Sequence, residues 1–289
     1  MSRRALWACL AFSLASCLEV PGFFFAGRPI DAYRWDEVDP ALDGDLSDAH
    51  ASLIPASARE ERFVLTASGA RIHVVYARHA GAPTILYAHG NGEHLGRFWD
   101  RVERLHALGF SVVIYDYPGF GRSEGEASER GLYEAADAVA SDLAADGETD
   151  LTRVFLYGYS LGAGPTTHLA RALSAPGSAF RPRGIVLEAA WCSIESLTQD
   201  AAGLDLPAEY LAGELRIDNC ERARAVRGVP VLALHGDDDG VVPLAEGRRL
   251  ARSFPEGAEF VVVEGARHAD LPLVWGAEYD ARIVAFVGE

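Results

Sequence analysis

The chain has 289 residues, with 42 acidic and 26 basic side chains and a net charge of −16. This acidic balance argues against nucleic-acid binding, which needs a basic face, and disfavours simple electrostatic docking on anionic lipid head groups. Hydrophobic residues make up 49% of the chain, enough for a full core, and the length suits one large α/β domain.

The first 16 residues have the pattern of a secretory signal peptide. Arg3 and Arg4 form a short basic region, and the apolar stretch 5–16 is shorter than the about 20 residues that cross a bilayer. The stretch runs into Leu-Ala-Ser-Cys at 14–17, which resembles the bacterial lipobox. Cys17 is therefore expected to be lipidated and to anchor the protein to the cell envelope. Leu18 favours the outer membrane; a soluble secreted protein is the alternative.

Residues 17–60 are acidic and rich in Pro and Ala with little periodicity, which indicates a tether and an N-terminal wrap. Strands are expected at 62–67 and 71–77, with a hairpin turn at 68–69. Strands and helices then alternate through a domain spanning 61–289, which predicts a mostly parallel sheet with helices on both faces. Helices are expected at 95–108, 128–145, 161–174, 244–253 and 274–286.

Two glycine-rich loops follow the next predicted strands. The strand 84–89 leads into Gly90-Asn91-Gly92, and we interpret His89 as a structural residue that braces this loop by a hydrogen bond. Asp116 and Ser123 lie in the second loop, where loop stabilisation is their expected role. That loop lacks the Lys-Ser/Thr of a P-loop and the third glycine of a dinucleotide site, so we expect no nucleotide cofactor.

Ser160 is the centre of a Gly-x-Ser-x-Gly motif at 158–162. An apolar strand precedes it and a helical pattern follows it, which is the strand-turn-helix context of a nucleophile elbow. Such a turn has strained backbone angles and needs glycines where side chains would collide with neighbouring elements. Ser160 is thus the candidate nucleophile, with the N–H of Leu161 as one oxyanion donor.

A serine nucleophile needs a base and an acid that orients it, in the order Ser, Asp or Glu, His. The acidic loop 237–239 follows a predicted strand at 229–235, and His268 follows another at 259–264. All three Asp residues, Asp237, Asp238 and Asp239, are candidates for the acid. The run Asp-Asp-Asp-Gly does not suit calcium, because the spaced ligands and distal Glu of a calcium loop are absent.

Five motifs in the same order resemble the α/β-hydrolase superfamily, in particular its BEM46-like serine hydrolases and the α/β-hydrolase-domain-containing (ABHD) proteins 12, 13 and 17. They are His89-Gly-Asn-Gly92, Asp116-Tyr-Pro-Gly-Phe-Gly121, the Ser160 elbow, His235-Gly-x-x-Asp239 and Gly265-x-x-His268. The resemblance implies an eight-stranded sheet, Asp239 as the acid, and the Asn91 N–H as the second oxyanion donor, with Gly92 as the alternative.

The same resemblance implies that residues 192–228, which contain no clear strand, form a small helical lid between strands six and seven. Cys192 and Cys220 lie in or beside it, and the sequence allows either a disulfide or two free thiols.

The implied activity is hydrolysis of a small-molecule ester or thioester by a monomer, without metal or cofactor. An aminopeptidase-like amide hydrolase is the alternative, and a non-catalytic binding module is the alternative of another class.

Overall fold

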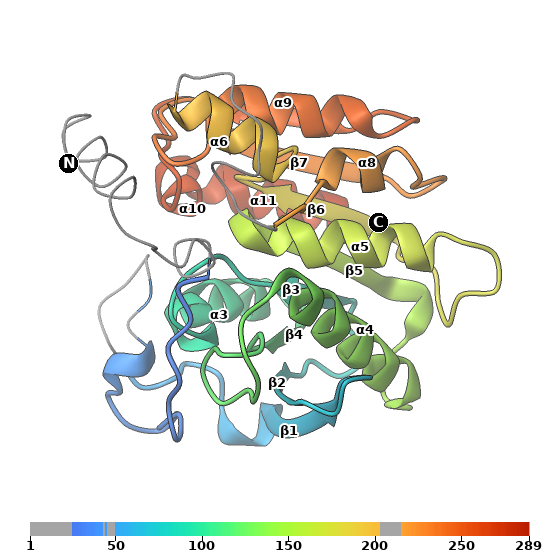
Figure 1. The fold of residues 1–289 in the computed structure, drawn as a ribbon. Helices are drawn as coiled ribbons and strands as arrows, with labels where there is room; N and C mark the ends of the chain where they lie inside the picture. The colour runs from blue at the N-terminus through green and yellow to red at the C-terminus, as the bar shows by residue number, and fades with distance from the viewer. Residues whose placement is uncertain (1–24, 43, 45–49, 203–214, 289) are drawn as a thin grey trace, which may run out of the picture.

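The structure is a computed structural model and describes residues 25–42, 44, 50–202 and 215–288 (Figure 1). The predicted signal peptide, Cys17 and the middle of the predicted lid, 203–214, lie outside the described residues.

An eight-stranded sheet forms the centre of the molecule. Its strands are β1 (Arg59–Leu65), β2 (Arg71–Ala77), β3 (Thr84–Ala88), β4 (Ser111–Tyr115), β5 (Val154–Tyr159), β6 (Gly184–Glu188), β7 (Val231–Gly236) and β8 (Glu259–Val263). Their spatial order is β1-β2-β4-β3-β5-β6-β7-β8. The pairs β1·β2 and β2·β4 are antiparallel and the other pairs are parallel, which confirms the mostly parallel eight-stranded sheet predicted above.

The first strand begins earlier than the predicted start at residue 62. Its opening residues 59–62 read Arg-Glu-Glu-Arg and carry no apolar alternation, so the hydrophobic pattern misses them. The strand extends because its pairing with β2 runs unbroken from Arg59 opposite Ala77 to Leu65 opposite Arg71. Charged side chains suit this position, because they discourage an edge strand from pairing with another molecule.

Helices cover both faces of the sheet. They are α3 (Trp99–Ala107), α4 (Glu129–Ala145), α5 (Ala163–Leu173), α6 (Ile194–Ala202), α8 (Asn219–Ala223), α9 (Leu244–Ser253), α10 (Leu271–Trp275) and α11 (Ala277–Val287). Short 3-10 turns are η1 (Pro40–Leu42), η2 (Ala56–Ala58), η3 (Leu95–Phe98), η4 (Leu151–Arg153) and η5 (Ser160–Gly162). α4, α5 and α9 pack on one face, and α3, α10 and α11 pack on the other (Figure 1).

Three predicted helices differ from the observed ones at their ends. Those expected at 95–108 and 161–174 begin as the 3-10 turns η3 and η5. The one expected at 274–286 is two helices, α10 and α11, separated by Gly276 with a φ of +56°. A residue with a positive φ interrupts a helix, and glycine adopts such a φ at little cost because it has no β-carbon.

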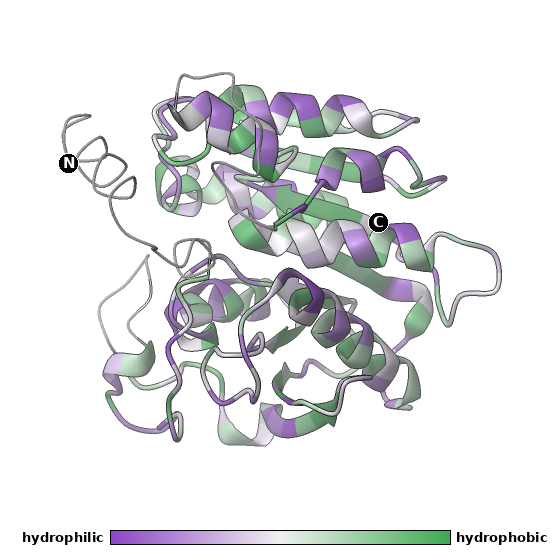
Figure 2. Cartoon of the chain, viewed as in Figure 1, coloured by the Kyte–Doolittle hydropathy of each residue, from purple (hydrophilic) through white to green (hydrophobic). Residues whose placement is uncertain are grey.

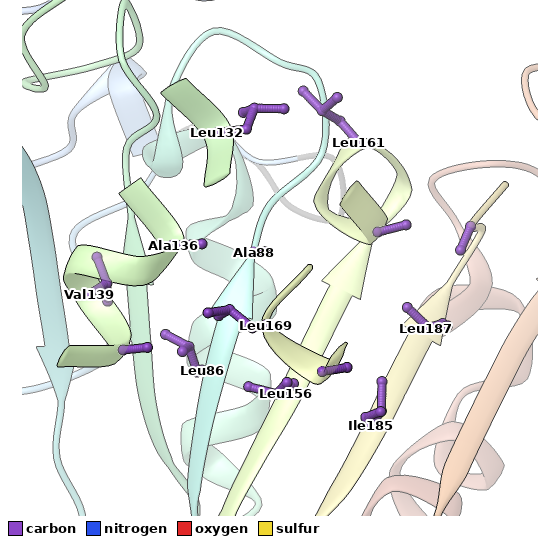
Figure 3. Packing of buried hydrophobic residues seen from close by; sticks show 14 of the residues in the cluster. Leu86, Ala88, Leu132, Ala136, Val139, Leu156, Leu161, Leu169, Ile185 and Leu187 are labelled. Atoms are coloured by element: carbon purple, nitrogen blue, oxygen red, sulfur yellow. The ribbon is translucent and has the colours of Figure 1, made fainter. Parts of the chain in front are cut away.

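The core lies on both sides of the sheet. In the close view, Leu169 of α5 lies beside Leu86 and Leu156 of the central strands, and Leu132 of α4 lies toward Leu161 (Figure 3). Hydropathy follows this arrangement, since β5 and β6 are coloured as hydrophobic while α9 alternates along its length (Figure 2). Strands buried on both faces are typical of parallel sheets.

The N-terminal segment packs against the domain. Its buried apolar side chains are Phe25, Tyr33, Trp35, Leu42 and Ile54. Two parallel bridges, Gly27 with Glu93 and Pro29 with Gly121, join it to the loops that follow β3 and β4. The segment therefore lies near the carboxyl ends of the strands, where open α/β sheets carry their sites.

Candidate active site

Ser160 lies in a sharp turn between β5 and α5. Its φ is +51°, a left-handed conformation that costs a non-glycine residue about 1–2 kcal/mol. Close packing explains the flanking glycines. A β-carbon on Gly162 would lie 1.9 Å from the carbonyl oxygen of Ala88, and one on Gly158 would lie 2.6 Å from Thr166 Oγ1. The motif therefore forms the strained strand-turn-helix elbow expected from the sequence.

His268 lies between Ser160 and Asp239. Its Nε2 is 2.9 Å from Ser160 Oγ, and its Nδ1 is 2.8 Å from Asp239 Oδ2. Both distances are within hydrogen-bonding range. The ring can thus donate from Nδ1 to the carboxylate and accept the serine proton at Nε2, the arrangement that a general base requires.

Of the three adjacent aspartates, Asp239 is the one whose carboxylate lies within hydrogen-bonding distance of His268. Its side chain is 0% exposed, and its Oδ1 accepts hydrogen bonds from Val241 N and Val242 N, each at 2.8 Å. Asp237 is exposed and its Oδ1 accepts from Gly265 N instead. A carboxylate held by two backbone amides has a fixed orientation, which suits a group that must orient an imidazole.

A second histidine lies against the same carboxylate. His235 Nε2 is 3.5 Å from Asp239 Oδ2 and 3.0 Å from the carbonyl oxygen of Val242. Burial lowers the pKa of His235, so at neutral pH the ring is uncharged and donates from Nε2. His235 therefore supports the acidic loop through its hydrogen bond to Val242 O. Because the His235 ring is neutral, it places no positive charge beside the Asp239 carboxylate.

The loop after β3 carries the other predicted oxyanion donor. Gly90 packs so tightly that a β-carbon there would lie 2.8 Å from the ring of Tyr159, the residue before the nucleophile. His89 is fully buried and its Nδ1 donates to Gly90 O over 2.8 Å, as expected of a brace. Burial lowers the pKa of His89 to about 4, so it is neutral. The loop that carries Asn91 thus packs against the turn that carries Ser160 and Leu161, through Gly90 on Tyr159 and Gly162 on Ala88.

Asp116, which follows β4, holds the segment after β3 in place. Its carboxylate accepts hydrogen bonds from Leu95 N at 2.8 Å, from Arg122 N at 3.1 Å and from the Tyr33 hydroxyl at 3.1 Å. Ser123 Oγ donates to the carbonyl oxygen of Asp116. These contacts join the loops after β3 and β4, as their sequence interpretation expected. The contribution of Tyr33 was missed, because it comes from a segment without periodicity.

A buried ion pair was also missed. Arg101 on α3 and Glu188 at the end of β6 lie 2.5 Å apart with almost no exposure. Arg101 Nη2 donates to Ala269 O over 2.7 Å, and its guanidinium lies 4.2 Å from the ring centroid of Tyr159. The Tyr159 hydroxyl in turn donates to His268 O over 3.2 Å. One cation therefore contacts both Tyr159, the last residue of the strand before Ser160, and the loop that carries His268. The signal in the sequence was Glu188 itself, a charged residue at the end of the apolar run 184–188, which indicates a buried charge that needs a partner.

Cys192 and Cys220 form a disulfide, with 4.9 Å between their Cα atoms. This settles the alternative left open by the sequence. The bond joins the residues just before α6 to α8, and residues 203–214, which the structure does not describe, lie between the two cysteines in the sequence. Glu246 of α9 also holds this region, since its Oε2 accepts from Cys192 N and from Ser196 Oγ.

Among the described residues, no group of three or more His, Cys, Asp or Glu side chains is arranged to hold a metal ion. In the same part of the chain, no helix has the length and apolar character needed to cross a bilayer.

Residues 81–208 match the family model described as serine aminopeptidase, S33. An uncharacterized Mycobacterium tuberculosis protein is 29% identical over 78% of this chain and 77% of its own length. The mouse α/β-hydrolase domain-containing protein 17C is 29% identical over 78% of this chain and 66% of its own length.

Solved structures share the fold. The Pyrococcus furiosus esterase Pf2001 aligns with a TM-score of 0.65 and 18% identity, over 91% of this chain and 97% of that one. An esterase from Exiguobacterium antarcticum aligns with a TM-score of 0.60 and 16% identity, over 80% of this chain and all of that one. At such identities the likeness concerns the fold alone.

Proposed function

We propose that this chain, which is similar to α/β-hydrolases in sequence and fold, is a serine hydrolase that cleaves carboxylic esters or thioesters through an acyl-enzyme. The observation that carries the proposal is the pair of hydrogen bonds made by His268. Its Nε2 lies 2.9 Å from Ser160 Oγ, and its Nδ1 lies 2.8 Å from Asp239 Oδ2.

In the proposed mechanism, Ser160 Oγ attacks the acyl carbonyl carbon while His268 Nε2 takes its proton. Asp239 stabilises the imidazolium that forms. The N–H groups of Leu161 and Asn91 donate to the oxyanion of the tetrahedral intermediate, and each donor contributes about 3 kcal/mol. Collapse of the intermediate expels the alcohol or thiol, which receives its proton from His268. Water then attacks the acyl-enzyme by the same steps in reverse and frees Ser160.

The ester assignment is supported by the esterases that share this fold. The name of the matching family model supports the alternative, an aminopeptidase-like amide hydrolase. A non-catalytic binding module is the third possibility. Backbone strain such as the φ of +51° at Ser160 persists only where the surrounding structure maintains it. A binding module would not need a strained serine held against an imidazole, so this geometry favours an enzyme.

Labelling with a fluorophosphonate probe tests the nucleophile. We expect wild-type protein to be labelled and Ser160→Ala to be unlabelled. Folded wild-type protein that resists labelling would favour the binding module. Turnover of p-nitrophenyl esters of increasing acyl length, set against aminoacyl p-nitroanilides, then separates ester from amide hydrolysis and gives the preferred chain length. A higher kcat/KM on the anilides would favour the alternative.

The site of action is proposed from the sequence alone. Cleavage before Cys17 and its lipidation would anchor the enzyme to the cell envelope, with the outer membrane favoured over a soluble secreted form. Fractionation tests this: Cys17→Ser should move the protein from the membrane pellet to the soluble fraction. Unchanged membrane association would contradict the lipid anchor.

A further inference from the structure

Residues 25–30, here called the N-terminal strap, run between the loops that follow β3 and β4. On one side, Arg28 N donates to the carbonyl oxygen of Glu93 over 2.8 Å. On the other side, Gly121 N donates to Arg28 O over 3.0 Å and Ile30 N donates to Gly121 O over 2.9 Å. The strap thus pairs with both loops at once and links them through backbone hydrogen bonds.

The strap also contacts the side chain of Asn91. Ala26 N donates to Asn91 Oδ1 over 2.7 Å. Asn91 is the residue whose own N–H is the proposed oxyanion donor, and it is exposed at the surface. A hydrogen bond that fixes its side chain also restrains the backbone to which that side chain is attached.

The loop that carries Asn91 contains a strained residue. Glu93 has a φ of +31°, and a non-glycine residue in such a conformation costs of order 1–3 kcal/mol, so it persists only where its surroundings hold it there. The backbone bond from Arg28 N to Glu93 O provides such support. The ion pair between the same two side chains is mostly exposed and contributes little.

The strap is closely packed. A β-carbon on Gly27 would lie 2.5 Å from Gly119 O and 2.7 Å from the ring of Phe120. Phe25 is buried in the core on the same face of the sheet as α4 and α5. The strap is therefore held in place by packing as well as by its backbone hydrogen bonds.

We propose that the N-terminal strap is a positioning element of the active site, which holds the Gly90–Glu93 loop so that the Asn91 N–H faces the oxyanion. This inference rests on the proposed function, because it concerns the same oxyanion site. Donors stabilise the transition state when they are fixed before the charge develops. A loop released from the strap would still bind substrate but would stabilise the tetrahedral intermediate less.

Ala26→Pro tests the proposal, because proline lacks the N–H that Asn91 Oδ1 accepts. Ala26→Ser keeps that N–H at the same exposed position and is the matched control. With active sites titrated by the fluorophosphonate probe, we expect kcat on p-nitrophenyl butyrate to fall by about tenfold or more in Ala26→Pro while KM changes little. The inhibition constant of a trifluoromethyl ketone, whose adduct carries an oxyanion, should rise by a similar factor. Ala26→Ser should match wild type in both.

Gly27→Ala is the second variant, in case Ala26→Pro folds poorly. Its methyl group would collide with Gly119 O and displace the strap, while the N–H of Ala26 remains. It should show the same paired loss. Wild-type kcat and inhibition constant per active site, with only a lower melting temperature, would overturn the positioning role. If wild type itself neither reacts with the probe nor hydrolyses any ester, the proposed function fails and the strap inference fails with it.

Discussion

Gly162 lies directly against the carbonyl of Ala88, so close that a β-carbon would be 1.9 Å from the oxygen. The contact joins the start of α5 to the end of β3. It therefore helps to set the distance between the Ser160 elbow and the loop of Asn91, because Ser160 lies two positions before Gly162 and Asn91 lies three positions after Ala88.

Gly162→Ala should accordingly damage both stability and catalysis. Overpacking against backbone costs about 1–3 kcal/mol, and misplacing one oxyanion donor lowers kcat about 100-fold. Gly164→Ala is the control, since its added β-carbon would lie 3.6 Å from Ile217 and 4.0 Å from Tyr133, which is ordinary contact. In the helix it should stabilise by up to about 1 kcal/mol. Urea unfolding and ester kinetics measure both, and equal behaviour of the two variants would contradict the packing argument.

The three adjacent aspartates should respond unequally to neutralisation. Asp239→Asn should lower kcat on a p-nitrophenyl ester by about 10⁴-fold, because the amide cannot stabilise the His268 imidazolium. Asp237→Asn and Asp238→Asn should stay within about twofold of wild type, because both residues are exposed and the Asp237 carboxylate accepts from Gly265 N rather than from His268. Unimpaired turnover by Asp239→Asn would show that another group orients the histidine.

Much of this arrangement was predictable from the sequence, because each side chain of the relay ends a strand or begins a turn with its own local signature. Hydrophobic runs predicted the parallel strands, and the motif around Ser160 predicted the elbow. The choice of Asp239 over its neighbours rested on resemblance. The hydrogen bonds from Val241 N and Val242 N to its carboxylate explain physically why Asp239 is the acid. No sequence pattern predicts these two bonds.

What the sequence did not predict depends on long-range contacts. Residues 25–58 have no periodicity, so the pairing of the strap and the contact between Tyr33 and Asp116 could not be foreseen. Arg101 and Glu188 are 87 residues apart, and nothing local indicates that they meet. Periodicity reports which face of an element is buried, but it does not report the partner of a buried charge.

The pair of Arg101 and Glu188 should be strongly coupled in stability. Arg101→Met leaves Glu188 as a buried, uncompensated carboxylate, which costs about 3–5 kcal/mol. Glu188→Gln should be similarly harmful, because it leaves the cation unpaired. The double variant removes both charges, and it should be less destabilised than the sum of the single variants. Urea unfolding of all four proteins gives the coupling energy, and strict additivity would contradict a direct interaction.

His89 should make stability depend on acidity. Burial lowers its folded pKa to about 4, against about 6.5 for an unfolded chain, so between these values the unfolded state binds more protons. Its contribution is therefore complete above pH 6.5 and is lost as the pH falls toward 4, by about 2 kcal/mol between pH 7.5 and pH 5. His89→Asn can still donate to Gly90 O but cannot titrate. The difference in unfolding free energy between the two proteins should shrink by that amount at pH 5, and a constant difference would contradict a neutral buried ring.

The disulfide between Cys192 and Cys220 should stabilise the protein measurably. It closes a loop with a sequence separation of 28 residues, for which the chain-entropy estimate is about 3–4 kcal/mol. Replacing both cysteines by serine should lower the melting temperature, and a reducing agent should lower that of wild type to a similar value. The double variant should not respond to the reductant, because the described chain then holds no other disulfide. If reduction leaves wild type unchanged, the two thiols are not joined in solution, and the base of the lid is held by Glu246 and by packing instead.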